Sequence, residues 1–342
     1  MRKRDLRLQS KSVSAMEQGR QALSFSGQVN AFIKKSPARM AVIIAVLLYV
    51  ITVAMVPTAL SARTLTTIGM LVLLLSFASA GQTIVLIGGG LDLSVGAVMS
   101  SAAIITVAVM NGQNGNFIPA FLIVMAMGAA VGLVNGVCTT KIGLPALIVT
   151  LVISNVVSRL QYVLTEGRPS GYPSPLFIQS IIYRFFGHIP SLVLYAFLLY
   201  PLVFYILNRS RFGRQLYLVG NNAEAARLSG INVNKVKVLS YVFSGMLAAF
   251  AGMLGVGFRQ IGQCQMFDNY AFESLIAVII GGTTFAGGVG SFSGSIAGAL
   301  VMVVLSNMLT TLGFPPPLRN IVFGGVLLLL LALYNRKKPV RQ

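Results

Sequence analysis

Few residues in this chain are of types that could carry out chemistry. Seven acids are scattered along its 342 residues: Asp5, Glu17, Asp92, Glu166, Glu224, Asp268 and Glu273. They do not group as metal ligands or as paired catalytic carboxylates, and no lysine follows a glycine as a phosphate-binding loop requires. The two cysteines, Cys138 and Cys264, match no metal-ligand spacing. The sequence therefore does not predict an enzyme, and we expect no cofactor or metal bound by this chain.

Two glycine-rich segments hold the polar groups best placed to meet a solute. Residues 87–96 have the sequence IGGGLDLSVG, and residues 281–294 have the sequence GGTTFAGGVGSFSG. Irregular backbone at membrane depth is tolerated only where protein or water covers it. Asp92 is a functional-site hypothesis by default in such a place, and it is equally well placed to cap a helix that begins at Leu93. We expect a translocation path near Asp92, Ser94, Thr283 and Thr284.

The rest of the chain must position these groups inside a membrane. Hydrophobic residues make up 56% of the sequence and charged residues 10%, and apolar runs recur at about the 20 residues needed to cross a bilayer. The sequence predicts an all-α polytopic inner-membrane helical bundle in which the spans next to 88–92 and 281–290 are broken or re-entrant. We expect about ten spans, approximately at 40–60, 65–87, 93–111, 117–138, 144–164, 190–208, 238–258, 271–286, 290–312 and 319–335.

Positive charge gathers in three places along the chain, whose formal net charge is +19. The clusters precede the first apolar run, fill the loop at 209–237 and follow the last run. Because cytoplasmic loops are enriched in Lys and Arg, this distribution predicts membrane topology, whereas a nucleic-acid partner requires a basic face with polar or aromatic readers. We expect a cytoplasmic N-terminal tail at 1–39, a transmembrane domain at 40–335 with an external segment at 165–189, and a cytoplasmic C-terminal tail at 336–342.

The basic loop at 209–237 also carries the signals of a short helix. Asn222 is placed to cap its first turn, Glu224 lies near the positive end of the helix, Arg227 lies near the negative end, and Gly230 is placed to stop it. A capped helix on a cytoplasmic loop is typical of a docking element. The alternative is a solvated basic connector whose charges only set topology.

Glycines at intervals of four mark two predicted packing faces. One face carries Gly128, Gly132 and Gly136, and the other carries Gly290, Gly294 and Gly298. Small residues at this spacing allow helix backbones to approach closely in lipid. We expect these faces to hold helices together.

Several blocks of sequence together resemble the membrane permease of the bacterial ribose-type ABC importers. The matching blocks are GGGLDLSVGAVMS at 88–100, RFGRQLYLVGNNAEAARLSGINVNKVK at 211–237, SGMLAAFAGML at 244–254 and IAVIIGGTTFAGGVGSFSGSIAGALVM at 276–302. The segment LGFPPPLRN at 312–320 departs from the family pattern. The resemblance covers most of the chain after its first 60 residues.

The resemblance implies a division of labour among several proteins in the membrane. Two permease subunits form the pathway, a cytoplasmic ABC ATPase that binds ATP and Mg²⁺ drives it, and a soluble sugar-binding protein delivers a monosaccharide from outside. It also implies a coupling helix that sits in a cleft of the ATPase, with apolar contacts from Ala225, Ala226, Leu228 and Ile231. Its residues are Asn221, Asn222, Glu224, Ala225, Ala226, Arg227, Leu228, Ser229, Gly230 and Ile231.

Two alternatives stay open at this stage. The first is a permease of the same architecture for a nucleoside, a sugar derivative or a branched-chain amino acid. The second is a self-contained secondary carrier or channel, which has no need of a capped helix in the central loop. Transport that survives disruption of that helix would favour the second.

Overall fold

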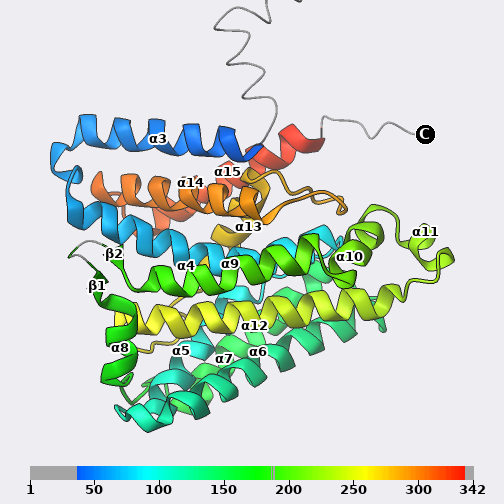
Figure 1. The fold of residues 1–342 in the computed structure, drawn as a ribbon, viewed down its shortest axis with the longest axis horizontal. Helices are drawn as coiled ribbons and strands as arrows, with labels where there is room; N and C mark the ends of the chain where they lie inside the picture. Colours follow the sequence, from blue (N-terminus) through cyan, green and yellow to red (C-terminus); the bar gives the residue numbers. More distant parts are fainter. Residues whose placement is uncertain (1–36, 186, 188, 336–342) are drawn as a thin grey trace, which may run out of the picture.

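The computed structural model describes residues 37–185, 187 and 189–335, which form a bundle of helices with their long axes roughly aligned (Figure 1). The expected tails at 1–36 and 336–342 lie outside the described residues. The helices are α3 Pro37–Met55, α4 Ala62–Ile87, α5 Val95–Met110, α6 Phe117–Thr140, α7 Ala146–Thr165, α8 Pro175–Ile182, α9 Leu192–Asn208, α10 Arg211–Asn221, α11 Ala223–Leu228, α12 Val233–Arg259, α13 Tyr270–Ile280, α14 Phe292–Thr311 and α15 Pro316–Asn335. Short 3-10 turns form η1 Pro57–Ala59 and η2 Asn114–Asn116, and β1 Arg184–Phe185 pairs antiparallel with β2 Ile189–Pro190.

The helix lengths support the predicted all-α membrane architecture. Within the described residues, six helices are long and apolar enough to cross a membrane, or seven if α9 and α10, which meet at 59°, count as one bent span. The helices α5 and α13 and the part of α15 at Pro316–Leu330 are apolar but shorter. The chain is therefore a multi-pass membrane protein, and the number of about ten spans stays a prediction.

Helix α4 lies at the centre of the bundle. Its second half is buried without interruption, from Leu74 to its end at Ile87, and it packs against α12, α13 and α14. Its polar groups are also inside: Thr83 Oγ1 lies 2.6 Å from Ser295 Oγ on α14. Lipid offers no hydrogen bonds, so polar groups on a helix that is buried on all sides can find partners only inside the bundle.

The first predicted packing face is confirmed. A Cβ atom added at Gly128 would overlap the carbonyl oxygen of Gly245, and one added at Gly132 would overlap that of Tyr241, both on α12. The third glycine, Gly136, lies against the backbone of Val238. Helices α6 and α12 are therefore in backbone contact along three turns, which only glycine allows.

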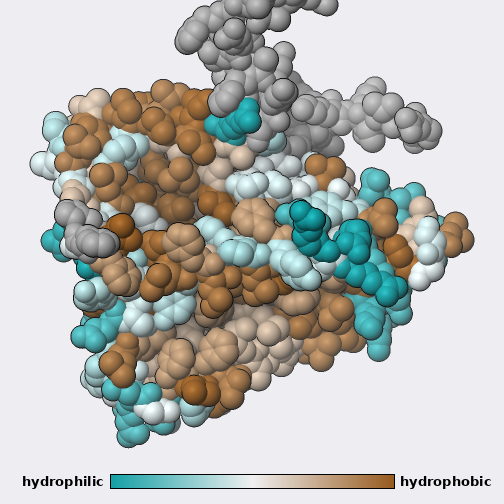
Figure 2. Space-filling model, viewed as in Figure 1, coloured by the Kyte–Doolittle hydropathy of each residue, from teal (hydrophilic) through white to brown (hydrophobic). Residues whose placement is uncertain are grey.

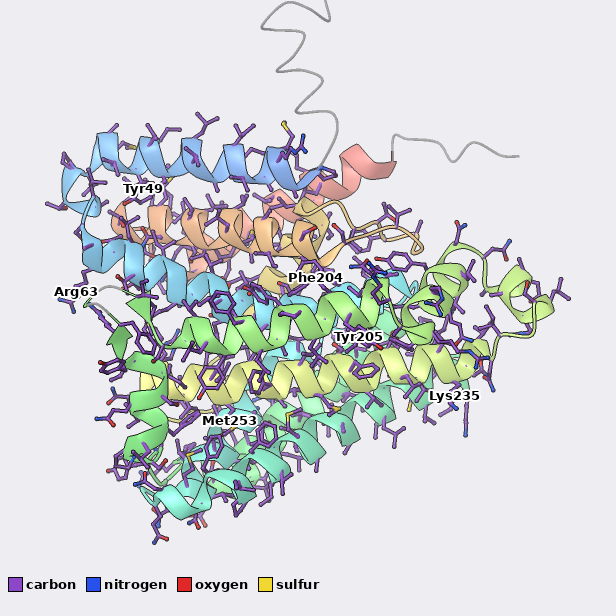
Figure 3. All side chains as sticks on the ribbon, viewed as in Figure 1. Tyr49, Arg63, Phe204, Tyr205, Lys235 and Met253 are labelled. Atoms are coloured by element: carbon purple, nitrogen blue, oxygen red, sulfur yellow. The ribbon has the colours of Figure 1, made fainter. Side chains whose placement is uncertain are left out.

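The two ends of the bundle differ in structure and surface. Helix α8 and the β1–β2 hairpin close one end, while α10 and α11 project from the other, toward which α3 begins and α15 ends (Figure 1). Figure 2 shows hydrophobic residues across the middle of the visible face and hydrophilic residues toward both ends. Figure 3 places Arg63 at the α8 end and Lys235 at the α11 end. This distribution fits a bundle whose long axis crosses the membrane.

Candidate functional site

Helix α11 has the caps that its sequence predicts. Asn222 Oδ1 accepts hydrogen bonds of 3.0 Å from the backbone N–H groups of Glu224 and Ala225. Gly230 follows the helix with φ +78°, a conformation that glycine adopts without strain. Arg227 lies 3.7 Å from Glu224, and both side chains are mostly exposed, so this ion pair contributes little. The helix is thus set by its two ends.

The exposed face of α11 is partly apolar. Leu228 has 82% of its surface exposed, and Ala225 is exposed beside it. Ala226 is only 4% exposed and packs with the core of its own chain. The side chain of Ala226 therefore turns toward the bundle, and the outward face of α11 is formed by Ala225 and Leu228. The contact of α11 with a partner stays a prediction.

Two irregular segments separate the ends of helices in the bundle. The first break is residues 88–94, between α4 and α5, and the second break is residues 281–291, between α13 and α14. They touch: the N–H of Gly288 donates a 2.8 Å hydrogen bond to the carbonyl of Ile87, just before the first break. The two glycine-rich segments found in the sequence are therefore neighbours in space.

Asp92 is buried in a network of hydrogen bonds within the first break. Its Oδ1 accepts from the backbone N–H of Ser94 at 2.9 Å and from Ser94 Oγ at 2.6 Å, and its Oδ2 accepts from Ser244 Oγ on α12 at 2.8 Å. Asn135 Nδ2 on α6 donates to Ser94 Oγ at 2.8 Å. Asp92 thus ties the start of α5 to α6 and α12. Helix α5 begins at Val95 rather than at 93, because the carboxylate holds the preceding turn.

The two threonines of the second break differ in their surroundings. Thr283 is fully buried, and its hydroxyl has no hydrogen-bond partner among the described residues. Thr284 is bonded within the break, from its N–H to the carbonyl of Val289 at 3.1 Å and from its hydroxyl to Gly287 at 3.3 Å. The structure brings both breaks together, and a path role for their polar residues stays a prediction.

Sequence reasoning missed other polar groups near the breaks. Gln82 and Ser79 lie one turn apart on α4, both fully buried, and neither side chain has a hydrogen-bond partner among the described residues. A polar cavity of about 180 Å³ lies beside the first break and is lined by Gly88, Gly89, Gly90, Thr139, Thr140, Leu144, Ala146, Lys237, Ser240 and Tyr241. The sequence signal that could have identified Gln82 and Ser79 is the presence of polar residues inside a long apolar run.

A partly buried carboxyl group, that of Asp268 in the loop between α12 and α13, also lies near the first break. A Cβ atom added at Gly96, near the start of α5, would lie 2.7 Å from the carbonyl oxygen of Asp268. No group of three or more metal-ligating side chains occurs among the described residues.

Comparison with known proteins gives consistent matches over most of the chain. Residues 64–331 match the family described as the permease component of the branched-chain amino acid transport system. The chain is 33% identical to the ribose import permease protein RbsC of Escherichia coli over 267 residues, 76% of this chain and 82% of that protein. It is 32% identical to the fructose import permease protein FrcC of Rhizobium meliloti over 88% of this chain and 86% of that protein. It is 30% identical to the galactose/methyl galactoside import permease protein MglC of Salmonella typhimurium over 73% of this chain and 80% of that protein. No solved structure matches the chain.

Proposed function

Because the chain belongs to the family of permease components of the branched-chain amino acid transport system, we propose that it is the membrane permease of an ATP-driven importer for a monosaccharide. The relatives named above import ribose, fructose and galactose or methyl galactoside. A pathway for a sugar needs groups that exchange hydrogen bonds with hydroxyls. The buried hydroxyl and amide groups around the two breaks are of that kind.

The observation that carries the proposal is the exposed, doubly capped α11 at one end of an apolar bundle. Leu228, with 82% of its surface exposed, and the exposed Ala225 beside it give this helix an apolar face that a partner can cover. We propose that this partner is an ABC ATPase that binds ATP and Mg²⁺, with a sugar-binding protein at the α8 end and a second permease subunit beside this one. A self-contained carrier has no use for such a helix.

The proposal fixes an orientation in the inner membrane. We propose ten crossings, made by the six long helices, the bent α9–α10 pair and the three shorter apolar helices. Helix α13, with 11 residues, extends only about 16 Å at 1.5 Å per residue. The irregular segments on either side of it must therefore supply the rest of its crossing of about 30 Å. An even number of crossings places both tails on the same side of the membrane as α11. The positive charge of these segments favours the cytoplasm for that side.

The decisive experiment changes the exposed face of α11. Ala225→Trp adds a bulky group there without entering the bundle, because Ala225 is exposed. We expect it to abolish assembly with the ATPase and ATP-driven sugar uptake while the permease still inserts. Gly115→Trp is the matched control for assembly with the ATPase, since Gly115 is exposed in a short turn at the other end with no atom within 4 Å of an added Cβ. Its uptake is not compared, because that end is where we propose that the sugar-binding protein binds. Full uptake by a well-expressed Ala225→Trp protein would refute the docking role.

The family description supports a second candidate solute, a branched-chain amino acid. Uptake into vesicles that contain the reconstituted importer separates the two. We expect labelled pentoses or hexoses to accumulate with ATP hydrolysis and labelled leucine not to accumulate. Accumulation of leucine alone would reverse the assignment.

A further inference from the structure

Helix α10 joins α11 to the two breaks. Asn222 ends α10, where its N–H donates to the carbonyl of Leu218 at 3.1 Å, and the same residue caps α11. Because the same residue ends α10 and caps α11, the angle between the two helices can change little. A displacement of α11 therefore moves α10 as well.

The side chains of Leu216 and Val219 are buried on the inner face of α10, but at Gly220 this face meets backbone directly. A Cβ atom added at Gly220 would overlap the carbonyl oxygen of Ile87 and lie 2.5 Å from the nitrogen of Gly288. Ile87 and Gly288 are themselves joined by the 2.8 Å hydrogen bond between the breaks. Three segments that are far apart in the sequence therefore meet at one point with no side chain between them.

Neighbouring contacts enlarge this point into a surface. A Cβ atom added at Gly287 would lie 2.8 Å from the carbonyl oxygen of Gly220 and 2.9 Å from the Cα atom of Gly89. Tyr217, one turn before Gly220, donates a 2.9 Å hydrogen bond from its hydroxyl to the carbonyl of Gly290. We name this surface the glycine junction, and it consists of residues 87–89, Tyr217, Gly220, 287–288 and Gly290.

Contacts between backbones transmit displacement differently from contacts between side chains. A side chain absorbs a small shift by changing rotamer, whereas backbone atoms in contact must move together or separate. Packed interfaces of this kind switch between discrete arrangements instead of deforming continuously. Movement of α10 therefore acts on both breaks at once.

We infer that the glycine junction is the link through which a partner bound at α11 sets the position of both breaks. Gly220 and Tyr217 are the positioning residues of this link, and neither of them contacts the solute or the partner. The inference rests on the proposed function, since it assigns the route by which the state of the ATPase reaches the polar groups of the breaks.

The experiment uses the complete importer in proteoliposomes and measures sugar imported per ATP hydrolysed. Gly220→Ala forces α10 away from Ile87, so we expect insertion, ATPase binding and basal hydrolysis to persist while the sugar-to-ATP ratio falls. The fall should lie in the range of about 5- to 150-fold that typical coupling free energies represent. Tyr217→Phe removes one hydrogen bond without any clash and should lower the ratio by about twofold to tenfold.

Gly128→Ala is the matched control for Gly220→Ala. It creates the same kind of backbone overlap, with Gly245, in the contact of α6 with α12. We expect it to reduce the amount of folded permease but to leave the sugar-to-ATP ratio of the remaining protein unchanged. A ratio that falls equally in both glycine variants would overturn the inference, since any packing defect would then produce the effect.

Two further results separate this inference from the proposed function. A wild-type complex that imports no sugar with ATP refutes the proposed function itself. A wild-type complex that imports sugar, together with a Tyr217→Phe variant of unchanged ratio, refutes the junction and leaves the proposed function in place. Tyr217→Phe decides the matter even if Gly220→Ala fails to fold.

Discussion

Replacing Asp92 tests whether the hydrogen-bond network of the first break is a structural joint. The carboxylate is 1% exposed and accepts three hydrogen bonds, two from Ser94 and one from Ser244. The donors are themselves buried, so they have no water to turn to when the acceptor is removed. Asp92→Ala leaves all three without their acceptor.

The expected loss follows from the cost of unpaired buried donors. Each one costs about 1–3 kcal/mol, but the two serine hydroxyls can rotate toward backbone carbonyls of their own helix or turn. The backbone N–H of Ser94 has no such freedom. The variant should therefore lose about 2–5 kcal/mol of unfolding free energy. This range counts the full cost of the unpaired backbone N–H and a partial cost for the two hydroxyls.

Asp92→Asn is the informative companion variant. Its amide oxygen can still accept from Ser94, and its amide nitrogen can donate to Ser244 Oγ, which then accepts. We expect it to keep most of the stability that Asp92→Ala loses. The assay is thermal unfolding of the purified permease in detergent. The predicted loss corresponds to roughly 4–20 °C at the 2–4 °C per kcal/mol typical of domains of 150–250 residues.

Uptake measurements on the same variants decide between the two roles of Asp92. If Asp92→Asn is stable and imports sugar normally, the residue acts through structure alone. If it is stable and inactive, the carboxylate acts on the path. An Asp92→Ala protein as stable as the wild type would refute the reasoning, because the network could then not be holding α5 to α6 and α12.

Two further predictions concern α4 and the orientation of the chain. Gln82→Leu should raise the melting temperature, because an unpaired buried amide costs about 1–3 kcal/mol. It should also lower sugar uptake if that amide contacts the solute. A lower melting temperature would show that Gln82 is paired. A single cysteine placed at Ser210 should react with a membrane-impermeant reagent only after the cells are opened, and labelling in intact cells would overturn the proposed topology.

The local features of the candidate site were predictable from sequence. The caps of α11 depend on Asn222 and Gly230, which lie within nine residues of each other and act on neighbouring backbone groups. The same holds for the helices themselves, because long apolar runs leave few alternatives in lipid. Glycine spacing also predicted that the segment of α6 packs closely on another helix, although it did not predict that this helix is α12.

The features that depend on distant segments were not predictable. Asp92 lies 152 residues from Ser244, and its partner Ser94 lies 41 residues from Asn135. Nothing in one sequence indicates which serine in an apolar helix will face a particular carboxylate. The inward orientation of Ala226 was not predictable for a related reason: a six-residue helix has two faces, and which one turns inward depends on how α10 meets the bundle.

The glycines of the two breaks also play a role that amino-acid composition alone does not indicate. A run of glycines suggests loose backbone, yet three of these glycines lie where another backbone passes within contact distance: Gly281 against Gly294, Gly287 against Gly220, and Gly288 against Asn221. Such backbone is fixed by its neighbours, and a small shift is opposed by hard contacts on several sides. Motion in the breaks must therefore be a change from one packed arrangement to another, which requires a driving displacement from outside. The contact with α10 supplies a place where such a displacement can enter.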